Sequence, residues 1–220
     1  MGGFVATPCC CTDVSTDGHT ESVQLVTASP AVDEGFSASR LGGQFTMCVQ
    51  HHPQDAGFNI DITDGVSLVI VDIKRTTVSP KGGGNPNLTL QPHDRIIQAN
   101  GLSGDAAALM KELRSADTWE LTVQRPTEFQ AVVNRQGYDS LGLELQFAPN
   151  GTTLMIAGVS KGPIQDWNAK SKTHEIGKYD RIVEVNGTRG VSRDLLHAAK
   201  AEEVLRLSVL TYTSDLLEIA

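Results

Sequence analysis

Short runs in which apolar and polar residues alternate follow one another through most of this chain. In the first half they are FTMCVQ from Phe45, FNIDIT (Phe58 to Thr63) and VSLVIVDI, and Asp64-Gly65 separates the last two. A period of two residues predicts half-buried strands, and Asp-Gly between two such runs predicts a hairpin. The second half repeats this order with LELQF (Leu143 to Phe147), Asn150-Gly151 and TTLMIAGV. The pattern therefore predicts the same hairpin twice.

A longer repeat connects the two halves. HDRIIQANG (His93 to Gly101) returns 86 positions later as YDRIVEVNG (Tyr179 to Gly187). Apolar residues fall at every second position, at Ile97 and Ala99 and again at Val183 and Val185, which predicts one strand in each copy. The Asn-Gly at the end of both copies supplies the positive φ angles of a tight turn. Because a fixed period indicates duplicated units, we predict two tandem modules.

Each signature strand is followed by a predicted helix, AAALMKELR (Ala106 to Arg114) and SRDLLHAAK (Ser192 to Lys200). Apolar residues three and four apart form one face of each helix. These residues are Leu109, Met110 and Leu113 in the first helix, and Leu195, Leu196 and Ala199 in the second. Closing strands follow at Trp119 to Gln124 and at Leu205 to Leu210. The second half has an additional short helical stretch at Pro163 to Lys170, where the first half has a predicted flexible loop over 79–87.

These elements predict the domain organisation. Residues 1–43 are rich in Ser, Thr, Gly and Asp without periodicity, so we expect a disordered tail. The first module then covers 44–125, the second covers 128–213, and 214–220 form a C-terminal tail. Only Arg125, Pro126 and Thr127 separate the last strand of one module from the first strand of the next, which restricts their mutual orientation.

Charge and cysteine usage narrow the class of protein. The net charge of −8 over 220 residues argues against a nucleic-acid partner, because no basic cluster could neutralise a run of phosphates. No apolar run is long enough for a membrane span, and the N-terminus lacks the features of a secretory signal. Cys9, Cys10 and Cys11 are contiguous and Cys48 is distant, so no disulfide framework is indicated. We expect a cytoplasmic protein with reduced thiols.

A glycine flanked by apolar residues precedes each predicted hairpin, in SLGL (Ser140 to Leu143) and in DAGF (Asp55 to Phe58). The backbone amides of such a loop can converge on an anion. Together with the strand that follows it, the DRI…NG signature and the helix, this loop makes residues 45–213 resemble two PDZ domains in tandem. The resemblance implies a mainly β fold of two partly open barrels or sandwiches, each with five to six strands and one or two helices.

The resemblance also implies a non-enzymatic scaffold or adaptor that binds C-terminal peptides of other proteins. PDZ domains bind such a peptide by strand addition, hold its carboxylate on loop amides and bury its last side chain. Carried over to the second module, the peptide-binding residues are Arg135, Ser140, Leu141, Gly142, Leu143, Leu145, Ser192, Leu196 and Ala199. In the first module they are Ala56, Gly57, Phe58, Ile60, Ala106, Met110 and Leu113.

The two candidate sites differ in ways that favour the second module. Gln50 stands where the second module has Arg135, and Asp55 stands where the loop commonly has glycine. A carboxylate about 8 Å from the ligand's own would oppose binding by roughly 0.5–2 kcal/mol, although Asp139 reduces the contrast. The first helix position, Ser192 or Ala106 (Asp105 if the register shifts by one), lacks the His of PDZ domains that select Ser or Thr.

Other functions have weaker support in the sequence. His51-His52 and the glycine-rich Lys81 to Asn85 lack the spacing of metal or phosphate sites, so we expect no catalytic residues, metal or cofactor. Gly2 and the three cysteines, Cys9 to Cys11, could carry lipids, which would make the chain a membrane-recruitment adaptor. Ala6 departs from that motif, so an unmodified tail is favoured. A structural pair with degenerate or closed grooves is a third alternative, and we expect a monomer.

Overall fold

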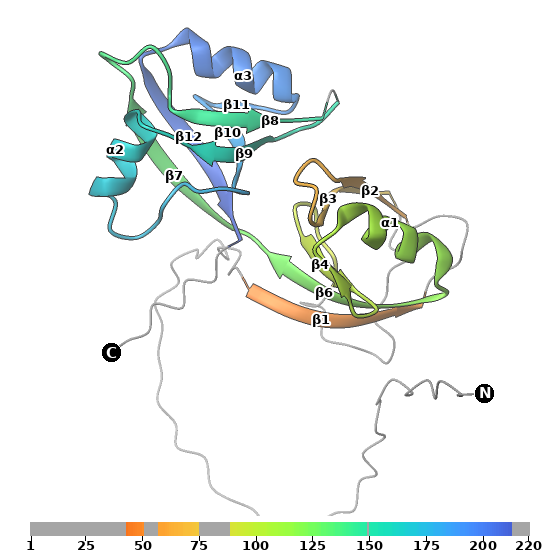
Figure 1. Ribbon diagram of the computed structural model, residues 1–220. Coiled ribbons are helices and arrows are strands. Elements are labelled where there is room, and N and C mark those ends of the chain that lie inside the picture. The colour runs from red at the N-terminus through yellow and green to blue at the C-terminus, as the bar shows by residue number, and fades with distance from the viewer. Residues whose placement is uncertain (1–42, 51–56, 75–88, 149, 213–220) are drawn as a thin grey trace, which may run out of the picture. The chain divides into compact units, whose positions relative to one another are not determined.

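The computed structural model describes residues 43–50, 57–74, 89–148 and 150–212. These residues belong to one compact unit, Ala38–Ala220, and form two antiparallel sheets of six strands each (Figure 1). The predicted mainly β fold is therefore confirmed. Gly43, the last residue of the predicted N-terminal tail, belongs to a strand. Residues 1–42 of that tail, the predicted loop over 79–87 and the predicted tail over 214–220 lie outside the described residues.

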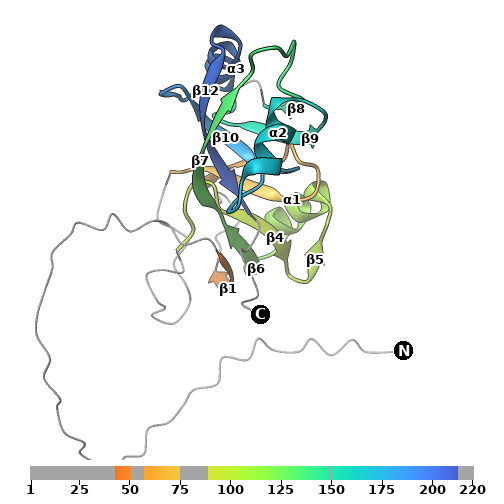
Figure 2. The same ribbon diagram turned by 90° about the vertical axis from the view of Figure 1, so that its left-hand side faces the viewer.

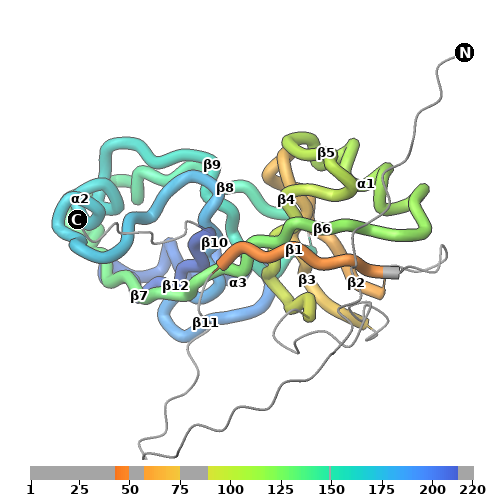
Figure 3. Tube along the Cα trace, turned by 90° about the horizontal axis from the view of Figure 1, so that it is seen from below, coloured from red at the N-terminus to blue at the C-terminus, as the bar shows by residue number. Residues whose placement is uncertain are grey.

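The first sheet has the strand order β1-β6-β4-β3-β2, and β5 pairs with β4. Its strands are β1 (Gly43–Gln50), β2 (Phe58–Asp61), β3 (Leu68–Ile73), β4 (Arg95–Ala99), β5 (Leu102–Ser103) and β6 (Thr118–Arg125). In Figure 3 β1 runs beside β6, as their eight-residue antiparallel register requires. The helix α1 (Ala106–Ser115) contributes Leu109 and Leu113 to a core that includes the fully buried Trp119.

The second sheet repeats this order as β7-β12-β10-β9-β8, and β11 pairs with β10. Its strands are β7 (Thr127–Asn134), β8 (Leu143–Gln146), β9 (Leu154–Val159), β10 (Arg181–Val185), β11 (Thr188–Arg189) and β12 (Val204–Thr211). Two helices accompany it, α2 (Pro163–Lys170) and α3 (Ser192–Ala201), and they lie apart from each other in Figures 1 and 2. The identical strand orders confirm the predicted duplication.

The signature strand β4 has a local irregularity in its alternation of buried residues. The register of β4 against β6 shifts between Ile96 and Gln98, so Ile96 is fully buried and Ile97 is only half-buried. The predicted strand is present, and a bulge changes the alternation of buried residues locally because it adds a residue. The turn that follows was predicted correctly. Asn100 and Gly101 have φ angles of 48° and 83°. Two consecutive positive φ angles are typical of a type I′ hairpin.

The predicted helices are all present, and their apolar faces are buried as expected. Leu195 and Ala199 of α3 are buried and Leu196 is half-buried, as are their counterparts in α1. Asp105 caps α1 by accepting hydrogen bonds from the amides of Ala107 and Ala108. Between β6 and β7 only Pro126 intervenes, one of the three predicted linker residues. None of the described helices has the length and apolarity needed to cross a bilayer.

Candidate peptide-binding site

The strand β8 lies at the margin of the second sheet, and in the described part of the chain its only ladder is with β9. Ser160 N donates to Gly142 O over 2.8 Å, and the register pairs Leu143 with Val159. In an antiparallel ladder this makes Leu143 a non-hydrogen-bonded position, so its amide and carbonyl point away from β9. Outward backbone groups of this kind are what an added strand would pair with. Among the residues that the structure describes, nothing pairs with this edge of β8, so it can accept an added strand.

The turn that enters β8 depends on glycine at position 142. Gly142 has φ +72°, and a Cβ there would lie 2.7 Å from Ser160 O and 3.0 Å from Lys161 O. Such a distance to backbone atoms forces the chain to shift, so no other residue fits without displacing the turn. The carbonyls of Leu141 and Gly142 accept from Ile164 N and Ser160 N. Within the described residues, the amides of Leu141 and Gly142 donate to no acceptor. These amides remain available to an anion.

Four leucines surround the turn and the strand. Leu141, Leu143, Leu145 and Leu196 are half-buried and pack against the core cluster that contains Ala199. On β8 the exposed Glu144 and Gln146 alternate with Leu143 and Leu145. Both leucines therefore point to the face of this edge strand that packs on the core. The structure thus gathers the five predicted pocket residues of the second module around one cluster. Their contact with a ligand remains a prediction.

The positions of two further predicted residues, Ser192 and Arg135, are defined by hydrogen bonds within the second module. Ser192 is fully buried, and its hydroxyl donates to Thr153 O over 2.8 Å. Its hydroxyl is therefore hydrogen-bonded within the core, and its contact with a ligand stays a prediction. Arg135 donates through one guanidinium nitrogen to Ala199 O at 3.3 Å and to Lys200 O at 3.5 Å. These carbonyls belong to the last turn of α3, where a positive charge is favourable. Arg135 thus lies beside the pocket residue Ala199, and Ser140 is exposed.

The first module has a similar sheet edge at β2, but a larger and more deeply buried side chain occupies it. The strand β2 ends its sheet, Gly57 has φ +71°, and Lys74 N donates to Gly57 O over 2.7 Å. Phe58, at the position of Leu143, is buried and meets Trp119 edge to face with ring centroids 6.0 Å apart. The other predicted residues divide into the buried Ala106 and Leu113 and the half-buried Ile60 and Met110. Ala56, Asp55, His51 and His52 lie outside the described residues, as do the glycine-rich residues 81–85.

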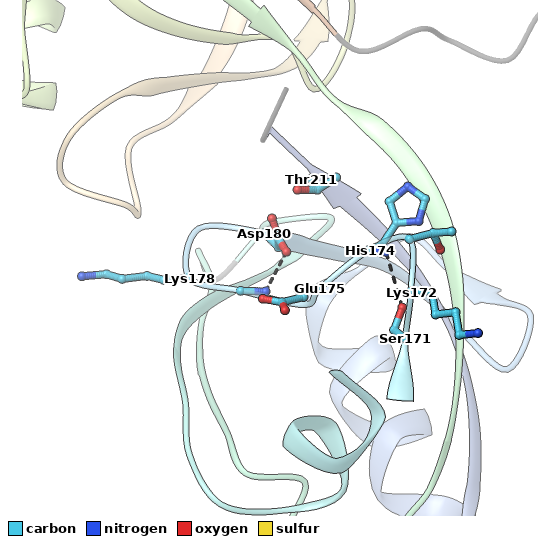
Figure 4. A pocket seen from close by; sticks show the side chains of 9 residues that line it. Ser171, Lys172, His174, Glu175, Lys178, Asp180 and Thr211 are labelled. Carbon is cyan, nitrogen blue, oxygen red and sulfur yellow. Dashed lines mark hydrogen bonds between the residues drawn. The ribbon is translucent and has the colours of Figure 1, made fainter. Parts of the chain in front are cut away.

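A hollow of about 390 Å³, lined mostly by residues with polar side chains, was not predicted from the sequence (Figure 4). It lies along the connection from α2 to β10 and is lined by Ser171, Lys172, Thr173, His174, Glu175, Gly177, Lys178, Asp180 and Thr211. Burial raises the pKa of Asp180 to about 6, although a hydrogen bond from Gly177 N opposes that shift. The His174 ring stacks on Phe129 with centroids 4.6 Å apart. No motif marks this hollow, and among the described residues no metal-binding group of His, Cys, Asp and Glu occurs.

Comparison with known proteins gives structural matches alone. No protein-family profile and no curated protein matches the chain. One solved structure, "Structure of INAD PDZ45 in complex with NG2 peptide", is 18% identical and covers 78% of this chain and 90% of its own, with a TM-score of 0.35. A second, "Complex structure of INAD PDZ45 and NORPA CC-PBM", is 16% identical and covers 78% and 92%, with a TM-score of 0.34. The chain is similar to these tandem PDZ structures.

Proposed function

We propose that this protein is a scaffold or adaptor whose two PDZ-like modules bind C-terminal peptides of partner proteins, mainly through the second module. The observation that carries the proposal is the margin of β8 beside Gly142. There the outward amide of Leu143 and the amides of Leu141 and Gly142, which have no acceptor within the described residues, lie next to a half-buried leucine cluster. A carboxylate on the amides and an apolar side chain on the leucines would satisfy both features.

The energetic requirement shows why both features are needed. Each added main-chain hydrogen bond contributes about 1 kcal/mol net, and a dissociation constant of about 1 μM corresponds to about 8 kcal/mol. Burial of one Leu, Ile or Val side chain adds about 1.5–3 kcal/mol. Three or four strand hydrogen bonds and one buried side chain therefore leave about 1–3.5 kcal/mol, a range that contains the 1.5–3 kcal/mol of a hydrogen bond to a charged group. Carboxylate capture at the Gly142 turn is thus a necessary part of the proposal.

Packing supports the preference for the second module. Phe58 of the first module fills its margin and contacts Trp119, whereas Leu143 of the second module is half-buried. A smaller, partly exposed side chain leaves apolar surface for a ligand to cover.

The test is a screen of C-terminal peptides against the full chain, in which each selected peptide is also titrated with an amidated C-terminus. We expect amidation to weaken binding by roughly 10- to 100-fold, because it removes the charge that the turn amides would hold. Selected peptides whose free and amidated forms bind equally would refute carboxylate capture. A Leu143→Lys variant then distinguishes the contributions of the two modules to binding, because it changes only the second site.

A further inference from the structure

The arginine of the repeated DRI signature has a different ionic partner in each module. In the first module Arg95 donates to Ser67 Oγ at 2.6 Å and to Asp64 at 2.9 Å, and both partners belong to the same β2–β3 connection. In the second copy, 86 positions later, Arg181 corresponds to Arg95 and Thr153 corresponds to Ser67. Asn150 stands where the first module has Asp64. The second module therefore lacks the carboxylate that neutralises this arginine in the first.

Arg181 instead forms an ion pair with Asp61 of the first module. Its side chain is 2% exposed, and one guanidinium nitrogen donates to Thr153 Oγ1 at 3.0 Å and to Asp61 Oδ2 at 2.5 Å. Asp61 is the last residue of β2, and its side chain is 9% exposed. Burial opposes ionisation of Asp61, but Arg181 and the hydrogen bonds from Thr63 outweigh it and hold the pKa below its usual value. A buried guanidinium without a counter-ion is strongly unfavourable, so this contact matters to the fold of the second module.

The first signature meets the second module in the same region. The Arg95 guanidinium lies over the Tyr179 ring at 5.1 Å and over the Tyr212 ring at 5.2 Å from their centroids. The Tyr212 hydroxyl donates to His93 O at 2.9 Å. His93 and Tyr179 are equivalent positions of the repeat and share a positive φ, 72° and 74°. Both DRI segments therefore take part in contacts between the modules, and Asp61–Arg181 supplies the ion pair.

We propose that Asp61 of the first module is the counter-ion that the second module lacks, and that the Asp61–Arg181 pair fixes the two modules as one rigid body. The proposal does not depend on peptide binding. It follows from the exchange of Asp64 for Asn150 between the copies and from the burial of both charged side chains. A module pair fixed in this way would present its two sheet margins at a constant separation.

The test uses the full chain with three variants. Asp61→Asn should lower the thermal midpoint by roughly 6–20 °C, because it leaves Arg181 buried without a counter-ion. Adding Asn150→Asp should restore most of that loss, since it supplies Arg181 with the internal carboxylate that Arg95 already has. Asp72→Asn is the matched control, because Asp72 is an exposed carboxylate on the adjacent strand β3, and it should leave the midpoint unchanged.

The second readout is the mutual orientation of the modules, measured by residual dipolar couplings. Wild type and Asp72→Asn should give one alignment tensor for both modules. The Asp61→Asn/Asn150→Asp double variant should be stable but give two different tensors, because its ion pair lies within the second module. An unchanged midpoint in Asp61→Asn, or one shared tensor in the double variant, would overturn the proposal. The double variant keeps the test decisive even if Asp61→Asn alone fails to fold.

Discussion

The sharpest single perturbation of the proposed site is Gly142→Ala. Gly142 has φ +72°, where an L-residue costs roughly 1–2 kcal/mol more than glycine. The new Cβ would also lie 2.7 Å from Ser160 O and 3.0 Å from Lys161 O. Both oxygens belong to the backbone, so the turn itself must move to relieve the contact. We therefore expect a stability loss of about 2 kcal/mol or more and a displaced turn.

The displaced turn should also weaken peptide binding. Hydrogen bonds to a charged group contribute about 1.5–3 kcal/mol, and their loss corresponds to roughly 10- to 150-fold weaker binding. The assay is isothermal titration calorimetry of the full chain with a screened peptide, at a temperature where the variant is folded by circular dichroism. Gly43→Ala is the control, because Gly43 has open space around its Cβ position. Binding by Gly142→Ala within twofold of the control would refute the assigned role of the turn.

Three further changes test separate parts of the account. Ala199→Leu should weaken peptides with large last side chains by roughly tenfold, because Ala199 lies among the half-buried leucines, and an unchanged ranking of peptides would contradict this. Ser192→Ala should lower the free energy of unfolding by about 1–3 kcal/mol, because the hydrogen bond to Thr153 O is lost. It should leave the ranking of peptides unchanged, and a changed ranking would indicate that Ser192 contacts the ligand. The pKa of Asp180 is raised to about 6 by burial, so the folded state binds its proton more tightly than the unfolded state. Its contribution to stability is full below about pH 4 and declines by roughly 2–3 kcal/mol as the pH rises through 6. Urea unfolding from pH 4 to pH 7 should show that decline in wild type relative to Asp180→Asn, and parallel curves would contradict it.

The repetitive parts of the fold were predictable because they depend on local patterns. Alternation identified the strands around both hairpins, and the Asn-Gly turns reappear with two positive φ angles each. The face of Leu195, Leu196 and Ala199 follows from helical periodicity alone. The period could not show which of Ile96 and Ile97 is more deeply buried, because a bulge depends on the register with the neighbouring strand and leaves no mark in the period.

The candidate site was predictable in composition but less so in orientation. The leucines of β8 and α3 lie together as expected, since each lies on the apolar face of its own element. Ser192 was assigned to the ligand by its position at the start of the helix, yet the nearby carbonyl of Thr153 draws its hydroxyl inward. The Asp61–Arg181 pair joins residues 120 positions apart, so no local pattern could show it. The one sequence signal that relates to this pair is that Asn150 in the second copy stands where the first copy has Asp64.

The most direct test of the central claim is to map a bound peptide on the isotope-labelled full chain by amide chemical shifts. The second sheet has two margins, β8 and β7, and only β8 begins at the Gly142 turn. The account predicts that the largest shifts occur at the amides of Leu141, Gly142 and Leu143, and that they shrink when the peptide is amidated. Shifts confined to β7, or equal shifts from the free and amidated peptides at the Gly142 turn, would contradict it.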